Sequence, residues 1–300
     1  MRFRKLAAAA VLTAMSTTAM AQSIRPDQAA FRDLYKELVE TNTTLSAGSC
    51  TLAAERMAAR LKAAGYSDKD VTLFAAPDHP KEGGLVAVLQ GTSKTVKPML
   101  LLAHIDVVEA RREDWVRDPF TLIEEGGYFY ARGAADDKAQ AAIWTDAMIR
   151  FKKEGFRPQR TIKLALTCGE ESVTAFNGAE YLARNKADLI SAEFALNEGG
   201  GGRLDKNGKK VALSMQVGEK TVQNYLFETT NPGGHSSVPR PDNAIYSLTA
   251  AVSKVGAYEF PIMFTDTTRV FFKRAGDAVG GEMGAAMKAL VANPNDAAAN

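Results

Sequence analysis

Two residues at the end of an apolar run carry the first chemical signal in this sequence. His104 follows the run 99–103, and Asp106 stands two positions after the histidine. A neutral imidazole binds a metal ion through one ring nitrogen, and its other N–H group commonly donates to a carboxylate. We therefore predict that His104 is a metal ligand and that Asp106 orients its ring.

Further carboxylates follow at the ends of other short apolar runs. Glu170 and Glu171 come after the run 162–167, Glu198 ends the run 194–197, and Asp136 lies in a Gly/Ala-rich loop before a helical pattern. In open α/β sheets, ligands bind at the carboxyl ends of strands. A pair of metal ions needs a bridging carboxylate, and we assign that role to Asp136. The set predicts a hydrolytic centre with two divalent ions, with Zn²⁺ as the expected metal.

The neighbouring carboxylates Glu170 and Glu171 need a particular backbone. In a strand they would face opposite sides of the sheet, so both can enter one site only from a loop. One of them could bind metal while the other accepts the proton of a metal-activated water.

Each of these residues also has an ordinary explanation. His104 could be a hydrogen-bonded structural residue, and the two glutamates could belong to a solvated loop. Asp136-Asp137 could simply begin a helix, and Glu198 could lie in a turn. Four such coincidences would have to fall at predicted strand ends, so we favour the metal site.

The elements that must position these residues alternate between strand and helix. Apolar runs predict strands at 85–89, 99–103, 162–167 and 194–197, and helical spacing predicts helix over 27–64 and 137–153. This alternation predicts an α/β fold with a mixed sheet flanked by helices. The pattern changes after residues 200–203, where strands at 211–216 and 225–229 and a helix at 243–255 indicate an α+β domain. We expect a catalytic domain over 22–212 and a second domain over 213–300.

The N-terminus has the pattern of a secretory signal peptide. Arg2, Arg4 and Lys5 precede the apolar stretch 6–15, and Ala19-Met20-Ala21 is a small-x-small cleavage site. The stretch is too short to span a bilayer, so an uncleaved anchor is the disfavoured alternative. We expect cleavage after Ala21 and a periplasmic or secreted protein. Loss of three positive charges takes the net charge from +2 to −1, which gives no electrostatic case for binding nucleic acid or an anionic membrane.

Cys50 and Cys168 are the only cysteines. An exported protein could oxidise them to a disulfide, but their separation in sequence does not give their distance in space. Because cysteine is among the most buried residue types, we favour two buried free thiols.

Longer strings resemble a known family. They are 104–108, Trp115 with 118–120, 130–138, Glu170-Glu171, and 233–237 with 243–245. They are similar to the co-catalytic zinc exopeptidases and deacylases, which include glutamate carboxypeptidase, carnosinase-type dipeptidases, acetylornithine deacetylase and succinyl-diaminopimelate desuccinylase. The resemblance implies a zinc-exopeptidase-like α/β domain with an inserted α+β lid through which the full-length form makes a homodimer. It also implies hydrolysis of amide bonds in dipeptides, short peptides or N-acyl amino acids.

The resemblance also implies roles for the metal-binding residues. Matched by motif, His104 and Glu198 would bind one metal ion. Glu171 would bind the second ion, and Asp136 would bridge both.

The catalytic roles transfer in the same way. Glu170 would be the general base, and Asp106 would orient the ligand histidine. His235 matches a lid-domain histidine that, in dimeric relatives, reaches the partner subunit's active site and steadies the substrate carbonyl oxygen.

One family feature is missing from the pattern. The family places a last metal-binding histidine after the lid, whereas the only histidines here are His79, His104 and His235, and His79 fits no family position. We therefore expect either a fragment of a longer reading frame or a truncated product. The alternatives to an active hydrolase are a catalytically inactive binding or regulatory product on the same fold and, less favoured, a periplasmic solute-binding protein.

Overall fold

The computed structural model describes residues 24–172 and 176–300, so the predicted signal peptide at 1–21 lies outside the described residues. The chain divides into two units, one ending at Glu198 and one spanning Gly199–Asn300. Each unit is described by itself, and the predicted domain boundary at residue 213 stays a prediction. In the part of the chain that is described, no helix is long and apolar enough to cross a membrane.

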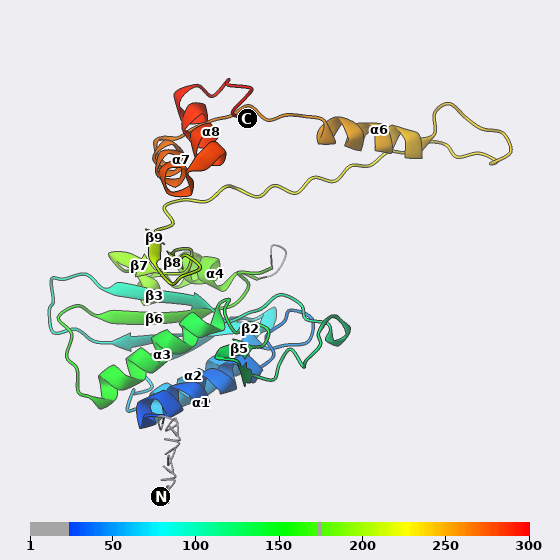
Figure 1. The fold of residues 1–300 in the computed structure, drawn as a ribbon. Coiled ribbons are helices and arrows are strands. Elements are labelled where there is room, and N and C mark those ends of the chain that lie inside the picture. The colour runs from blue at the N-terminus through cyan, green and yellow to red at the C-terminus, as the bar shows by residue number, and fades with distance from the viewer. Residues whose placement is uncertain (1–23, 173–175) are drawn as a thin grey trace, which may run out of the picture. The chain divides into compact units, whose positions relative to one another are not determined.

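A five-stranded mixed sheet forms the centre of the first unit (Figure 1). Its strands, in spatial order, are β1 (Val71–Ala76), β2 (His79–Leu89), β6 (Ile162–Thr167), β3 (Met99–His104) and β7 (Phe194–Leu196). β2 is antiparallel to β1 and β6, whereas β3 is parallel to both β6 and β7. The predicted mixed α/β class is therefore confirmed.

Helices cover both faces of this sheet (Figure 1). α1 (Pro26–Glu40), α2 (Cys50–Ala63) and α3 (Lys138–Lys153) lie on one face, and α4 (Gly178–Asn185) and α5 (Ala187–Ile190) lie on the other. Successive strand residues point to opposite faces, so Leu164 joins the α1–α3 core while Ala165 joins the α4 core. All six residues of β6 are buried, which suits its mostly apolar sequence, and the buried Lys163 donates through its Nζ to the Asp188 carbonyl at 2.8 Å.

The prediction of helix over 27–64 is wrong between residues 41 and 49, where the chain leaves the helix. The Asn42 side chain accepts hydrogen bonds from the N–H and hydroxyl of Thr44, both at 2.9 Å. Ser49 caps α2 by accepting the Leu52 N–H at 3.1 Å. Such side-chain bonds offer the backbone an alternative to helix, and apolar spacing alone does not reveal them.

Smaller elements complete the first unit and build the second. The first contains η1 (Arg112–Asp114) and the hairpin of β4 (Ile123–Glu125) and β5 (Tyr128–Tyr130). The second contains the hairpin of β8 (Gly201–Leu204) and β9 (Lys210–Ser214), followed by α6 (Ala244–Gly256), α7 (Asp266–Val279) and α8 (Gly281–Ala292). The predicted strand at 225–229 is wrong: these residues pair with no strand, and a lone extended segment is not stable as a sheet.

Candidate metal centre

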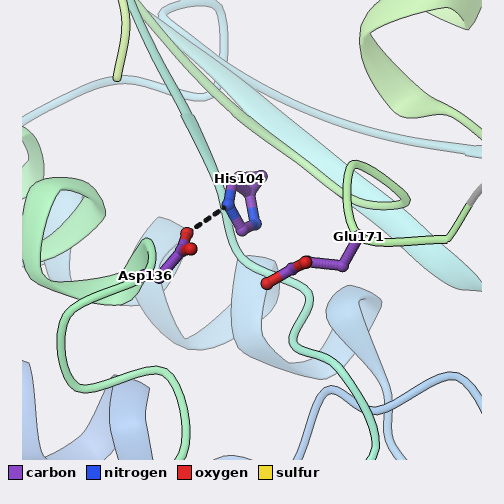
Figure 2. A group of neighbouring side chains, drawn as sticks. All are labelled: His104, Asp136 and Glu171. Atoms are coloured by element: carbon purple, nitrogen blue, oxygen red, sulfur yellow. Dashed lines mark hydrogen bonds and ion pairs between the residues drawn. The ribbon is translucent and has the colours of Figure 1, made fainter. Parts of the chain in front are cut away.

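The parallel strands deliver the predicted site residues to one edge of the sheet. β3 and β6 are paired so that His104 lies opposite Thr167, and both strands therefore end at the same level. Glu170 and Glu171 follow β6 in a loop, as their adjacency requires, and Glu198 follows β7. Asp136 arrives from the loop before α3. Figure 2 shows Asp136 and Glu171 approaching His104 from either side.

His104 is the centre of this cluster. Its Nε2 atom lies 3.0 Å from Asp136 Oδ1, 3.6 Å from Glu198 Oε2 and 3.8 Å from Glu170 Oε2. Ligand-type atoms of His104, Asp136 and Glu171 all lie within 4.8 Å of one another. Donors that approach this closely can share one cation.

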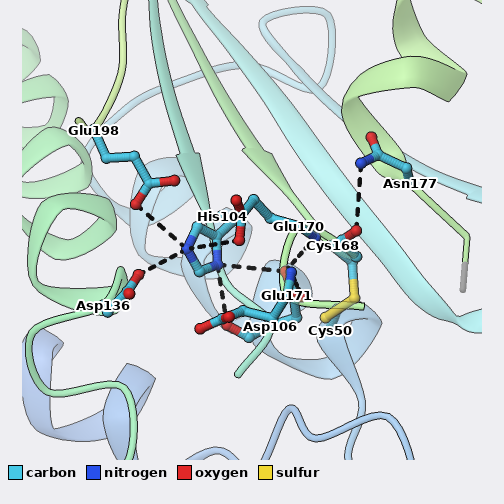
Figure 3. Close-up of polar contacts among 10 residues, drawn as sticks. Cys50, His104, Asp106, Asp136, Cys168, Glu170, Glu171, Asn177 and Glu198 are labelled. Carbon is cyan, nitrogen blue, oxygen red and sulfur yellow. Dashed lines mark hydrogen bonds and ion pairs between the residues drawn. A yellow bond between two sulfur atoms is a disulfide. The ribbon is translucent and has the colours of Figure 1, made fainter. Parts of the chain in front are cut away.

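Asp106 contacts both His104 and the loop after β6 that carries Glu170 and Glu171, here called the glutamate loop (Figure 3). The Nδ1 atom of His104 lies 3.1 Å from the Asp106 backbone carbonyl oxygen and 3.5 Å from Oδ1 of its carboxylate. The same carboxylate accepts the backbone N–H groups of Glu170, at 3.3 Å, and Glu171, at 3.0 Å. With Nδ1 donating to Asp106, the lone pair of the neutral ring is on Nε2, which faces the carboxylate cluster.

Burial and the charges of neighbouring carboxylates shift the pKa values of several residues in the cluster. Burial alone would lower the pKa of His104, but the hydrogen bond and charge of Asp106, with the charges of Glu198 and Asp137, raise it to about 10. Burial raises the pKa of Asp137 to about 7, with the charges of Glu198 and Asp136 adding to the effect. Burial also raises the pKa of Glu171. These shifts indicate an excess of negative charge that a cation would relieve.

Asp137 is a site residue that the sequence analysis did not identify. It is buried, and its carboxylate forms a second close group with His104 and Glu198, again within 4.8 Å. Its Oδ2 atom has no hydrogen-bond partner among the described residues. The pair Asp136-Asp137 carries the only signal in the sequence, and the start of a helix explains both carboxylates equally well.

Two predicted catalytic residues lie in different surroundings. The Glu170 side chain is 53% exposed at the edge of the cluster, so it can contact solvent and substrate. His235 belongs to the second unit, where its exposed ring accepts the backbone N–H of Ser237 at Nδ1, 3.2 Å away.

The expectation of two free thiols is wrong. Cys50 and Cys168 form a disulfide whose Cα atoms are 6.0 Å apart. The bond lies beside the glutamate loop (Figure 3). Sequence separation could not reveal it, because the two cysteines are 118 positions apart and the chain between them folds back through α2, α3 and six strands.

The donor set suits a divalent metal. It combines one imidazole with several carboxylates, the ligands that Zn²⁺ takes in hydrolytic sites. Six carboxylates lie at or next to His104, and burial lowers the pKa of the nearby Lys138 to about 7, so little positive charge offsets them. These carboxylates belong to Asp106, Asp136, Asp137, Glu170, Glu171 and Glu198. The residues present therefore fit a metal centre.

Comparison with known proteins gives the family. The model of peptidase family M20/M25/M40 matches residues 100–297. The chain belongs to this peptidase family. Its members are metal-dependent hydrolases, which agrees with the donor set.

Individual relatives match over part of their length. The chain is 32% identical over 202 residues to human N-fatty-acyl-amino acid synthase/hydrolase PM20D1, covering 66% of this chain and 40% of that protein. It is 33% identical over 180 residues to human aminoacylase-1, covering 59% and 42%. The M20 metallo-carboxypeptidase Sso-CP2 from Sulfolobus solfataricus aligns in structure with a TM-score of 0.48 at 23% identity, covering 59% of this chain and 38% of that one. The chain thus spans about two fifths of the length of these relatives.

Proposed function

We propose that this protein is an exported metal-dependent hydrolase that cleaves the amide bond of N-acyl amino acids, dipeptides or short peptides. The observation that carries the proposal is the convergence of His104, Asp136, Glu171 and Glu198 at one sheet edge in a chain of the M20 family. The similarity to an N-fatty-acyl-amino acid synthase/hydrolase and to an aminoacylase supports N-acyl amino acids as the first substrates to test.

The proposed ligands divide between two ions, with Zn²⁺ as the expected metal. His104 and Glu198 would hold the first, Glu171 the second, and Asp136 would bridge both, while Asp106 holds the imidazole through Nδ1. When bound, such ions polarise the substrate carbonyl and lower the pKa of water.

Glu170 would carry the proton. Its exposed carboxylate lies beside the ligand cluster and would accept a proton from the attacking water, then return it to the nitrogen of the leaving amine. Glu170 would be free for this proton transfer because the neighbouring Glu171 would bind the metal.

His235 would hold the substrate carbonyl oxygen in a homodimer. Its Nδ1 accepts the N–H of Ser237, so the neutral ring carries its hydrogen on Nε2 and presents a donor to a ligand oxygen. We propose that this donor serves the active site of a partner subunit, as the family resemblance implies.

Export is supported by the disulfide and by the N-terminal charge pattern. Disulfides persist in oxidising compartments and are rare in reducing ones. The Cys50–Cys168 bond therefore favours a periplasmic or secreted protein.

Metal analysis of three variants tests the ligand assignment. Asp136→Ala should lose both metal ions, because a bridging ligand serves two, whereas His104→Ala should weaken mainly one. Asp118→Ala removes a carboxylate outside the cluster and should bind as the wild type does. Zinc content would be measured by atomic emission after dialysis, with hydrolysis of N-acyl amino acids and dipeptides assayed in parallel. Unchanged metal content in Asp136→Ala would refute the assignment.

A further inference from the structure

The Cys50–Cys168 disulfide joins two functional parts of the first unit. Cys50 is the first residue of α2, and Cys168 directly follows β6. Glu170 and Glu171 stand two and three residues beyond Cys168, so the disulfide lies at the start of the glutamate loop (Figure 3). Both cysteines are buried, at 2% and 5% exposed.

Hydrogen bonds hold the described residues at the two ends of this loop. The Cys168 carbonyl accepts the N–H of Gly178 at 2.7 Å, and the Gly169 carbonyl accepts from the Asn177 side chain at 3.3 Å. The N–H groups of the two glutamates donate to Asp106. Water can compete for each of these bonds, so the net contribution of each to stability is small. The disulfide is the restraint that water cannot replace.

A cavity adjoins the loop on the α2 side. It measures about 200 Å³ and its lining includes Thr44, Gly48, Cys50, Asp106, Cys168 and Gly169. Close packing is what normally fixes a backbone in place, and atoms that line a cavity have fewer packing partners on that side. The disulfide lies in the wall of this cavity and joins the loop covalently to α2.

We infer that the Cys50–Cys168 disulfide positions the backbone of Glu170 and Glu171 at the metal centre. The bond fixes Cys168 against α2, and the fixed chain keeps both glutamate N–H groups on Asp106. The Glu171 carboxylate therefore lies close to His104 and Asp136 before any metal binds, and the loop does not have to rearrange first. The two cysteines are positioning residues, and the consequence for metal retention rests on the proposed function.

Hydrogen exchange tests the positioning without any metal. In chelator-treated protein, the Cys50→Ala/Cys168→Ala double variant should exchange the Glu170 and Glu171 amides at least ~10-fold faster than the wild type, because each lost restraint opens the loop more often. Leu61→Ala is the matched control. It removes a fully buried side chain from the same helix, 11 residues from Cys50, which is about 16 Å along the axis. It should lower the melting temperature while leaving those two amides at the wild-type rate.

Metal release tests the consequence. The double variant should give up one ion to a chelator about 10-fold faster than the wild type, and Leu61→Ala should not. Reducing the folded wild type provides a second route that needs no mutation. A phosphine takes oxygen from water to form phosphine oxide, and the two sulfurs gain one hydrogen each, which mass spectrometry can verify. The reduced protein should match the double variant in both measurements.

The outcomes separate the two claims. Wild-type exchange rates at both glutamates in the double variant or the reduced protein would overturn the inference, as would equally fast exchange in Leu61→Ala. A wild-type protein that binds no divalent ion would instead refute the proposed function, and the exchange result would still decide whether the disulfide positions the loop.

Discussion

At the scale of single residues, Glu170 is the side chain whose role is most sharply testable. Glu170→Gln is nearly isosteric, so the loop and its bonds to Asp106 should persist and the metal should stay bound. The amide cannot accept a proton, and general acid–base catalysis typically contributes about 10²–10⁴-fold. We expect kcat to fall by that factor at wild-type zinc content. Near-normal turnover would assign the proton transfer to another group.

The ionisation of His104 predicts a pH dependence of stability in the metal-free protein. Its pKa in the folded state is raised from 6.5 to about 10. A raised folded-state pKa stabilises the fold fully below the unfolded value and loses that contribution as pH rises through the folded value. The unfolding free energy of the wild type relative to His104→Gln should therefore fall between about pH 6.5 and about pH 10. Urea denaturation in the presence of a chelator would measure it, and a constant difference across that range would contradict the shift.

At the scale of elements, the glutamate loop depends on a glycine. Gly169 has φ +87°, and a Cβ there would lie 1.7 Å from the Phe176 carbonyl oxygen. Gly169→Ala must therefore move the backbone, and we expect a loss of more than about 1 kcal/mol of stability together with weaker metal binding. Gly126→Ala is the control, since Gly126 also has a positive φ, +61°, with open space around it. Calorimetry should show the larger loss for Gly169, and equal losses would rule out the collision as the cause.

The inner strands could be predicted because burial on both faces favours apolar runs, as in residues 99–103 of β3. β1 was not predicted, because its buried residues Val71, Phe74 and Ala76 follow no strict alternation and so give no period-2 signal. The break after α1 was missed because side-chain bonds of Asn42 and Ser49 create it. At the site, placement after strands predicted that His104, Glu171 and Glu198 converge, and Asp136 joins them from the loop before α3. Asp137 was missed because a helix start explains it equally well.

At the scale of the whole molecule, the export proposal gives a simple expectation. The chain purified from the periplasm or the culture medium should begin at Gln22, because the small residues Ala19 and Ala21 suit signal peptidase. Intact-mass measurement would detect the loss of residues 1–21. A control with Ala19→Lys and Ala21→Lys should keep the full-length mass, and a wild-type exported chain that retains Met1 would show that the segment is not cleaved.

The parallel register of β3 and β6 limits how this family can change in length. His104 lies opposite Thr167, and side chains along a strand alternate between faces. Inserting or deleting one residue inside either strand would turn every following side chain to the other face and carry the histidine away from the carboxylates. The connector at 90–98 pairs with no strand and can vary in length without this effect. Alignment gaps between diverged relatives therefore belong in such connectors, and a gap placed within 99–104 or 162–167 marks an alignment error or a lost site.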